Sequence, residues 1–285
     1  MIETSAMSVA ALLRWYLDAG VDETIGERPL DRYRDAAGAG EAPDAAGEAR
    51  SSSAPAADGE PRTDRAAPSV RAPSARAPAA GPVAGAVHLA SRATSLDQLR
   101  QALSGFDGCP LSGTATNLVF GDGNPAARIV FIGEAPGAEE DLRGLPFVGP
   151  SGRLLDQMLA SIGLDRTRVF ISNTVFWRPP GNRNPSTTEV ATCMPFVERM
   201  LELIDPVLLV ALGGPAASAL LGQKESVGRL RGRVFSYQTA GLSRPVRARV
   251  MYHPAYLLRT PAQKRLAWRD LLALKQDIEA AGPNS

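Results

Sequence analysis

The sequence has little cysteine and histidine and no long apolar run, and each shortage excludes a class of protein. The 285 residues include two Cys and two His, too few for a disulfide framework or for a four-thiolate metal or iron–sulfur site. No stretch of about 18 apolar residues occurs, so no transmembrane helix is expected. The N-terminus carries Glu3 where a secretory signal needs positive charge. We therefore expect a cytoplasmic, monomeric protein.

Net charge is also small, but it is unevenly distributed. The chain has 31 Lys and Arg against 30 Asp and Glu. Residues 1–94 carry 10 basic and 13 acidic side chains, whereas residues 95–285 carry 21 and 17. A modestly basic C-terminal domain is compatible with nucleic-acid binding without requiring it.

Aromatic residues are missing from a long internal segment, because none occurs between Tyr33 and Phe106. Residues 35–86 are mainly Ala, Pro, Gly and Ser, which bury too little apolar surface to offset the entropy of ordering. The sequence thus predicts an amphipathic helix (6–19) with its tail in residues 1–34, a disordered linker in residues 35–94 and a globular domain in residues 95–285. The linker either tethers a helix that binds a protein partner or is a neutral spacer, and its composition favours the spacer.

The C-terminal domain alternates short apolar runs with amphipathic segments. Alternation of strands and helices predicts an α/β fold, a three-layer sandwich with a central, mainly parallel sheet and helices on both faces. Ligands of such sheets bind at the carboxyl ends of the strands. The expected strands are residues 128–133, 168–172, 207–212, 234–237 and 246–252, and the expected helices are 151–164, 187–204, 215–221 and 262–278.

The segment after the first of these strands carries the features of a ligand-binding loop. It reads GEAPGAEEDLRGLPFVGPSG over residues 133–152, and its glycines let the backbone approach a ligand closely. Ser151 and Gly152 open the next helix, whose N-terminus can hold a phosphate. The alternative is an ordinary strand-to-helix loop, but four acids and Phe147 in one loop disfavour it.

Two further strand ends carry polar side chains. Asn173 follows the second strand, and its amide matches a nucleobase edge that shows both a carbonyl and an N–H; a simple turn residue is the alternative. His253 follows the last strand and is the only imidazole of the C-terminal domain. A structural role for a lone histidine is equally compatible with this position. Tyr256, Leu257 and Leu258 beside Arg259 suggest an apolar wedge next to a phosphate contact.

Taken together, these segments resemble the uracil-DNA glycosylase superfamily, and most closely its family 4, over residues 98–278. The matching pieces stand in family order. They are GCPL at 108–111, VFGDGNP at 119–125, the loop at 133–152, SNTVFWRPPGNRNPSTTE at 172–189, LGGPAASALLG at 212–222 and HPAYLLR at 253–259.

The resemblance implies a DNA glycosylase that removes uracil, in single- or double-stranded DNA, at the start of base excision repair. Gly133 and Glu134 would line the base pocket, Phe147 would stack on the flipped base and Asn173 would read the uracil edge. His253 would stabilise the uracil anion as it leaves. The DNA contacts would come from Ser151, Gly152, Arg183, Tyr256, Leu257 and Arg259.

Water is the expected nucleophile, because the alternative amine requires a lysine in the site. The three lysines are Lys224, Lys264 and Lys275, all outside the loops described above. Which acid handles the water is left open among Glu134, Glu139, Glu140 and Asp141, of which Glu140 and Asp141 match the family's acidic pair. Each is equally well explained as a solvated loop acid.

The sequence departs from family 4 at the positions that the resemblance assigns to an iron–sulfur cluster. Two of the four ligand positions hold Phe106 and Trp177, and the others keep Cys109 and Cys193. We expect no cofactor and no metal, with the aromatic rings filling the cluster's place. A two-cysteine metal site is the less favoured alternative.

Three other functions are weighed against the glycosylase. A non-catalytic DNA-binding module on the same fold is disfavoured by the presence of both Asn173 and His253. A nucleotide-dependent enzyme lacks its phosphate-binding motifs. Covalent trapping of the abasic product, known in another branch of the superfamily, needs a histidine that residues 178–186 lack. Six arginines between residues 229 and 249 are expected either to follow the DNA backbone or to form a solvated face.

Overall fold

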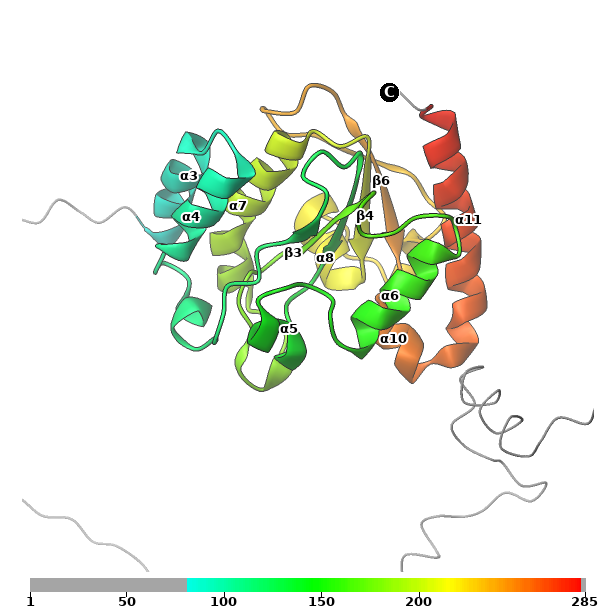
Figure 1. Cartoon of the computed structure of the whole chain (residues 1–285), viewed down its shortest axis with the longest axis horizontal. Coiled ribbons are helices and arrows are strands. Elements are labelled where there is room, and N and C mark those ends of the chain that lie inside the picture. Colours follow the sequence, from blue (N-terminus) through cyan, green and yellow to red (C-terminus); the bar gives the residue numbers. More distant parts are fainter. Residues whose placement is uncertain (1–80, 283–285) are drawn as a thin grey trace, which may run out of the picture. The chain divides into compact units, whose positions relative to one another are not determined.

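The computed structural model describes residues 81–282, which form an α/β domain (Figure 1). The predicted helix over residues 6–19 and most of the predicted linker lie outside the described residues. Within residues 81–282, no helix is long and apolar enough to cross a membrane. The elements are α3 (Pro82–Arg92), α4 (Leu96–Ser104), η1 (Pro110–Gly113), β1 (Asp122–Gly123), β2 (Ile129–Gly133), α5 (Ala138–Arg143), α6 (Pro150–Ala160), β3 (Phe170–Asn173), η2 (Pro180–Asn182), α7 (Thr187–Ile204), β4 (Leu208–Leu212), α8 (Gly214–Leu221), α9 (Val227–Leu230), β5 (Phe235–Tyr237), β6 (Val246–Met251), α10 (Pro254–Arg259), η3 (Pro261–Gln263) and α11 (Lys264–Ala280).

The strands form one sheet in the order β1-β3-β2-β4-β6-β5. The four central strands are parallel, and β1 and β5 pair antiparallel at the two edges. Every residue of β2 and β4 is buried, as expected for strands covered on both faces. The predicted α/β class with a mainly parallel sheet is confirmed. Because β2, β3, β4 and β6 end at the same edge, the segments that follow them meet there.

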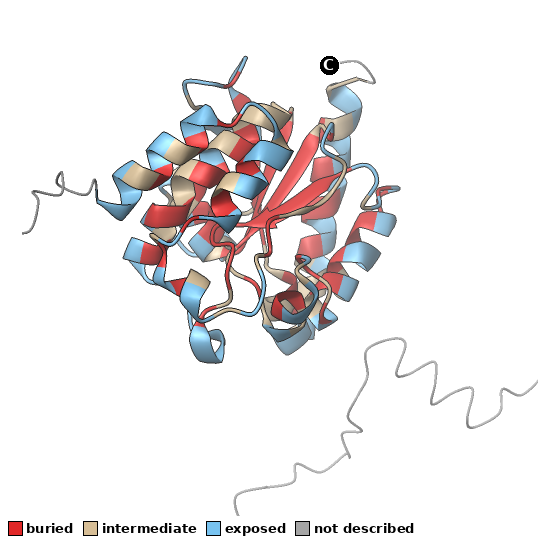
Figure 2. Cartoon of the chain, turned by 60° about the vertical axis from the view of Figure 1, so that its left-hand side comes forward, coloured by how far each residue is buried: buried red, intermediate tan, exposed pale blue. Residues whose placement is uncertain are grey.

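Helices cover both faces of the sheet and bury two apolar cores (Figures 1 and 2). Alternate residues of β2 point to opposite faces, as the pleat of a strand requires. Val130 and Ile132 pack in the core beneath α3, α4, α7 and α8. Ile129 and Phe131 pack in the core beneath α6, α10 and α11. The loops at the strand ends are therefore anchored from two sides.

The globular domain begins earlier than the predicted residue 95. Helix α3 lies in the last part of the predicted linker, and Ala86 and Ala90 on it are 0% and 2% exposed in the first core. Arg199 of α7 also donates a hydrogen bond to the carbonyl oxygen of Ala93, at 3.0 Å. The small alanine side chains let α3 pack closely on α7, so an alanine-rich composition here marks a helix interface rather than a disordered chain.

Helix α7 forms where the sequence predicts it and begins with the expected capping box. The Ser186 hydroxyl accepts a hydrogen bond from the Glu189 amide at 3.2 Å, and the Glu189 carboxylate accepts one from the Ser186 amide at 2.7 Å. These contacts satisfy two backbone donors that a helix start otherwise leaves unpaired.

Two short helices occupy segments that the sequence predicts as loops. Residues 138–143 form α5 at the centre of the loop after β2, and residues 254–259 form α10 directly after β6. In α10, Pro254 stands at the first helical position, where its missing N–H is harmless. The expected DNA-wedge loop is thus a helix with one buried and one exposed face.

Candidate active site

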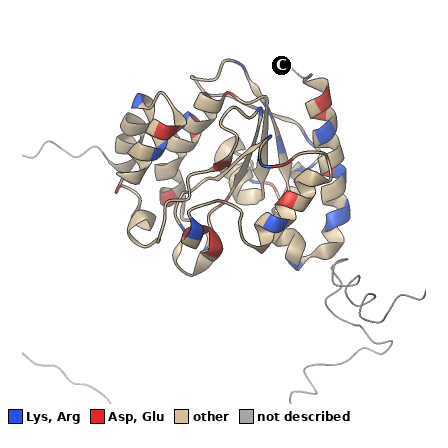
Figure 3. Ribbon diagram, viewed as in Figure 1, with Lys and Arg blue, Asp and Glu red and all other residues tan. Residues whose placement is uncertain are grey.

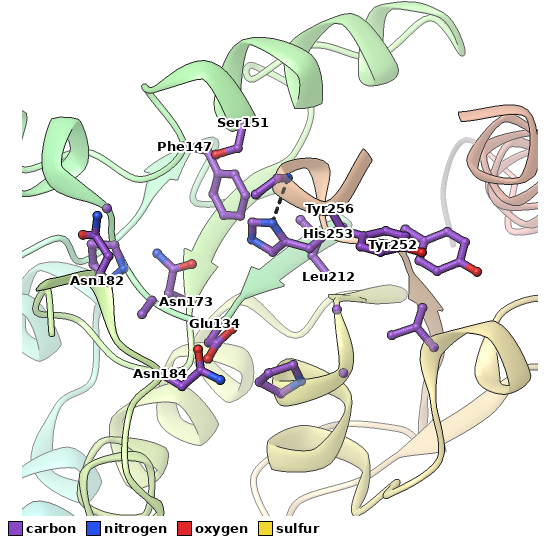
Figure 4. A pocket seen from close by; sticks show the side chains of 18 of the residues that line it. Glu134, Phe147, Ser151, Asn173, Asn182, Asn184, Leu212, Tyr252, His253 and Tyr256 are labelled. Atoms are coloured by element: carbon purple, nitrogen blue, oxygen red, sulfur yellow. Dashed lines mark hydrogen bonds between the residues drawn. The ribbon is translucent and has the colours of Figure 1, made fainter. Parts of the chain in front are cut away.

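A cavity of about 820 Å³ opens at the edge of the sheet where the parallel strands end. The segments after β2, β3, β4 and β6 all contribute to its wall. Figure 4 shows Phe147, Asn173 and His253 turned toward one another within it. The structure thus brings together the three side chains that the sequence assigned to uracil recognition. Other lining residues include Glu134, Glu140, Ser151, Arg183, Gly213, Ser226, Gly228, Tyr252, Tyr256 and Arg259.

Gly133 ends β2 at a point where no side chain fits. A Cβ atom placed on it would lie 2.5 Å from Asn173 Oδ1 and 2.6 Å from Phe147 Cζ. Both distances are well below van der Waals contact. The glycine therefore lets the amide of Asn173 and the ring of Phe147 approach the same strand end.

Phe147 has a backbone conformation that side chains rarely adopt. Its φ is 52°, in the left-handed region, which costs about 1–3 kcal/mol for a residue other than glycine. Its ring is 4% exposed and lies 5.4 Å from the His253 ring, centroid to centroid. The surrounding structure thus stabilises a strained turn that directs the ring of Phe147 into the cavity.

Asn173 is 1% exposed, and its Oδ1 atom has no hydrogen-bond partner among the described residues. An unmade hydrogen bond in the interior costs about 1–3 kcal/mol. Because the side chain lines the cavity, a ligand donor entering it would satisfy this oxygen. This unpaired acceptor is the clearest sign of a ligand in the described structure.

His253 caps the start of α10 with its ring. Its Nδ1 atom accepts a hydrogen bond from the Ala255 amide at 3.1 Å, the dashed line in Figure 4. A neutral imidazole that accepts at Nδ1 carries its proton on Nε2. Burial lowers the pKa of His253 to about 4; the positive charge of Arg259 acts in the same direction, and Glu140 opposes it. At neutral pH the ring is therefore uncharged and presents an N–H donor.

The two acids expected from the family's acidic pair have structural roles. Both oxygens of Glu140 are occupied, since they accept hydrogen bonds from the amides of Val148, Gly149 and Gly137 at 2.9, 2.8 and 3.1 Å. Glu140 lines the cavity, but its carboxylate holds the loop. Asp141 lies outside the cavity wall. Asp141 therefore does not reach the cavity, whereas a catalytic role for Glu140 stays a prediction.

Asp141 joins α5 to the segment before β1. Its Oδ1 atom accepts from the amides of Thr116 and Asn117 at 2.8 and 3.1 Å. Glu134 differs from both acids, because it lines the cavity and no hydrogen bond ties down its carboxylate among the described contacts. Burial raises the pKa of Glu134 above the ordinary value.

Residues 120–272 match the family model of the uracil DNA glycosylase superfamily. The chain belongs to this superfamily. It is 43% identical to a type-4 uracil-DNA glycosylase of Archaeoglobus fulgidus over 171 residues, which cover 59% of this chain and 85% of that protein. It is 40% identical to one from Thermotoga maritima over 177 residues, 61% of this chain and 90% of that protein. A type-5 uracil-DNA glycosylase of Thermus thermophilus is 38% identical over 116 residues, 35% of this chain and 52% of that protein.

The DNA contacts expected from the superfamily resemblance are only partly placed at the cavity. Ser151, Tyr256 and Arg259 line it. Gly152 does not face it, because the Phe147 carbonyl oxygen lies 1.7 Å from where a Gly152 Cβ would stand. Its lack of a side chain leaves room for the backbone of Phe147 at the turn.

Leu257 is also misassigned as a DNA wedge. It is 1% exposed and packs in the core beneath α6 and α11, whereas its neighbour Leu258 is 41% exposed. A six-residue helix buries one side, and the residue order alone did not show which leucine faces inward. The exposed apolar side chain of α10 is Leu258.

Most of the arginines considered for the DNA backbone are paired with acids. Arg183 lines the cavity and forms a two-pronged ion pair with Glu189, at 2.7 and 2.9 Å. Arg231 binds Asp270 in the same way, at 2.9 Å for both contacts. Arg247 and Arg249 bind Asp277, and Arg233 binds Glu225. Figure 3 shows basic and acidic positions interspersed along α11. Arg247 and Arg249 of β6, together with Arg231 directly after α9, thus fasten α11 to the sheet.

Sequence reasoning missed the part of the cavity wall that follows β4. Gly213 has a φ of 96° and precedes α8, and a Cβ on it would lie 3.3 Å from His253 Cβ. Tyr252, whose ring stacks on Tyr256 at 5.0 Å, was also missed. The sequence signal for Gly213 was the pair Gly213 and Gly214 at the end of a strand. Because β4 and β6 are neighbours, the segment after β4 lies beside His253.

The residues at the superfamily's cluster positions do not fit an iron–sulfur cluster. Cys109 and Cys193 are fully buried with their Sγ atoms 3.9 Å apart. Phe106 is 7% exposed and packs on Phe196 at 5.1 Å between ring centroids, and Trp177 is 5% exposed in the same core. Two thiols and two apolar rings supply half the donors such a cluster needs.

Proposed function

We propose that this chain is a monofunctional uracil-DNA glycosylase, which flips uracil out of DNA and hydrolyses its N-glycosidic bond. The product is an abasic site, so the reaction begins base excision repair. The observation that carries the proposal is the unpaired Oδ1 of Asn173, in a cavity that also holds an aromatic face and a neutral imidazole. The proposal includes action in the cytoplasm, as a monomer, on single- or double-stranded DNA.

Recognition of uracil follows from the hydrogen-bonding groups of the cavity. The Asn173 amide offers an acceptor and a donor side by side, matching the N–H and the carbonyl on one edge of uracil. Phe147 supplies a face on which the base stacks, and such stacking is worth about 1–3 kcal/mol per base. Reaching this cavity requires the base to leave the duplex, which is easier for a mispaired base.

Bond cleavage leaves negative charge on uracil and positive charge on the sugar. The Nε2–H of His253 donates to the departing base, and a donor fixed in advance stabilises charge without reorganisation during the reaction. Because the imidazole is neutral, it stabilises the anion as a hydrogen-bond donor and not as a cation. Loss of one such donor costs about 2.7–4 kcal/mol in the barrier.

Water completes the reaction at the sugar. The acid best placed to orient it is Glu134, whose carboxylate lines the cavity without being committed to the backbone. No lysine is among the residues that line the described cavity, so an amine nucleophile and strand cleavage are not part of the proposal.

The test is a labelled oligonucleotide with one uracil, incubated with the protein and then treated with alkali. Strand cleavage that depends on alkali is the expected result. Cleavage without alkali would contradict the hydrolytic mechanism. Retained DNA binding with no cleavage under either condition would favour the non-catalytic module instead.

We also infer that the domain folds without an iron–sulfur cluster. Support comes from the donor set of two thiols and from the aromatic rings that fill the other two positions. Protein purified anaerobically should contain no stoichiometric iron and show no visible absorbance, while remaining active. Iron bound in stoichiometric amounts and lost in Cys109→Ser would overturn this inference.

A further inference from the structure

The strained turn at Phe147 is held by a charged side chain from outside the cavity. Arg166 lies in the turn between α6 and β3, and its guanidinium donates to the carbonyl oxygens of both Pro146 and Phe147. The Nη1–O distance to Pro146 is 3.1 Å. These two carbonyls belong to the peptide units on either side of the residue with positive φ.

The same guanidinium is fixed in turn by two carboxylates. Nη1 lies 2.6 Å from Asp122 of β1, and Nε lies 2.8 Å from Asp156 of α6. The Arg166 side chain is 24% exposed. A planar fork with five donors can hold two carbonyls and two carboxylates at once, which the single ammonium of a lysine cannot do with the same geometry.

The loop between β2 and α6 is thereby held from two sides. Glu140 fastens its amides at residues 137, 148 and 149 from within. Arg166 donates hydrogen bonds to the loop's carbonyl oxygens at residues 146 and 147. Glu140 and Arg166 both hold the peptide unit after Phe147, through the Val148 amide and the Phe147 carbonyl, but of the two only Arg166 also holds the peptide unit before it, through the Pro146 carbonyl.

We propose that Arg166 is a positioning residue of the active site, which holds the Phe147 backbone so that the ring stays where the base stacks. The inference rests on the proposed function, because it assigns the ring a bound base. A residue of this kind acts on the reaction only through Phe147. Displacing a substrate-positioning group by about 1 Å can cost up to about 100-fold in rate.

The experiment is a double-mutant cycle between Arg166 and Phe147, measured as the single-turnover excision rate with enzyme in excess. Arg166→Lys should lower the rate by about 10-fold to 100-fold in the native background. In a Phe147→Ala background the same change should lower it by less than about twofold, because there is no ring left to position.

Arg168→Lys is the matched control. Arg168 lies two residues away in the same turn and donates to the carbonyl oxygen of Gly163 at 3.0 Å, away from Phe147. Its substitution should leave the rate within about twofold in both backgrounds. Thermal unfolding of each variant separates a loss of folded protein from a loss of positioning.

Two outcomes would overturn the proposal. One is an equal loss for Arg166→Lys in both backgrounds, which indicates a general structural role. The other is a crystal structure of Arg166→Lys in which Phe147 keeps its left-handed conformation and ring position. That structure also tests the proposal if the native protein fails to excise uracil, in which case the proposed function fails separately.

Discussion

At the scale of single residues, the protonation state of His253 determines what the site can do. A ring that accepts at Nδ1 from a backbone amide cannot be protonated without breaking that hydrogen bond. Burial works in the same direction and depresses its pKa to about 4. The proposed catalytic donor and the cap of α10 are therefore the same neutral imidazole.

This state predicts how activity depends on pH. An ordinary histidine would titrate near pH 6.5, but His253 should stay neutral well below that, so its contribution to the excision rate should be lost only as pH falls toward about 4. Single-turnover rates from pH 8 down to pH 4 test this. His253→Ala should be slower than the native protein by about 100-fold to 1,000-fold at neutral pH, and the difference should narrow as pH falls toward about 4. A native profile that loses activity around pH 6.5 would contradict the assignment.

Glu134 needs its own control in that experiment, because burial raises its pKa above the ordinary value. A step in the profile that disappears in Glu134→Gln belongs to Glu134 and not to His253.

The lowered pKa of His253 also predicts how the free energy of unfolding depends on pH. A histidine in a salt bridge has a raised pKa and would give the opposite dependence. The unfolded chain binds the proton at higher pH than the folded chain, so the free energy of unfolding should fall as pH drops from about 6.5 to about 4.

At the scale of helices and strands, local signals in the sequence predicted most elements. The capping box at Ser186 and the apolar spacing that follows it identify α7, because both act between residues three or four positions apart. The apolar runs identify the buried strands for a similar reason. Asn173 and His253 were predictable as cavity residues because each stands at the end of a strand on the common edge. Phe147 lies far from any strand end, and its role came from the family resemblance alone.

The structural roles that could not be predicted from the sequence depend on contacts between residues far apart in the chain. The backbone contacts of Glu140 were not predicted, because its amide partners at Val148 and Gly149 come from the far end of the same loop. Leu257 was taken for a wedge because the burial of α10 is decided by α6 and α11. Arg166 gave no signal at all, since its partners Asp122 and Phe147 are 44 and 19 residues away.

At the scale of the whole molecule, the position of the domain boundary determines which residues the domain needs in order to fold. Helix α3 completes the first core: Ala86 and Ala90 on its inner side and Ala93 directly after it are all under 5% exposed. The catalytic domain therefore requires a start near residue 81 and not near residue 95.

Two truncated chains distinguish these boundaries. A chain that begins at residue 81 should match the full chain in excision rate and unfolding temperature. A chain that begins at residue 95 lacks α3 and Ala93, and losing the burial of their three alanine methyl groups alone removes roughly 2 kcal/mol of stability. For a domain of this size, that lowers the unfolding temperature by about 4–8 °C. Equal unfolding temperatures for the two truncated chains would mean that α3 does not stabilise the domain. A slower excision rate in the chain that begins at residue 81 would instead assign residues 1–80 a part in DNA binding.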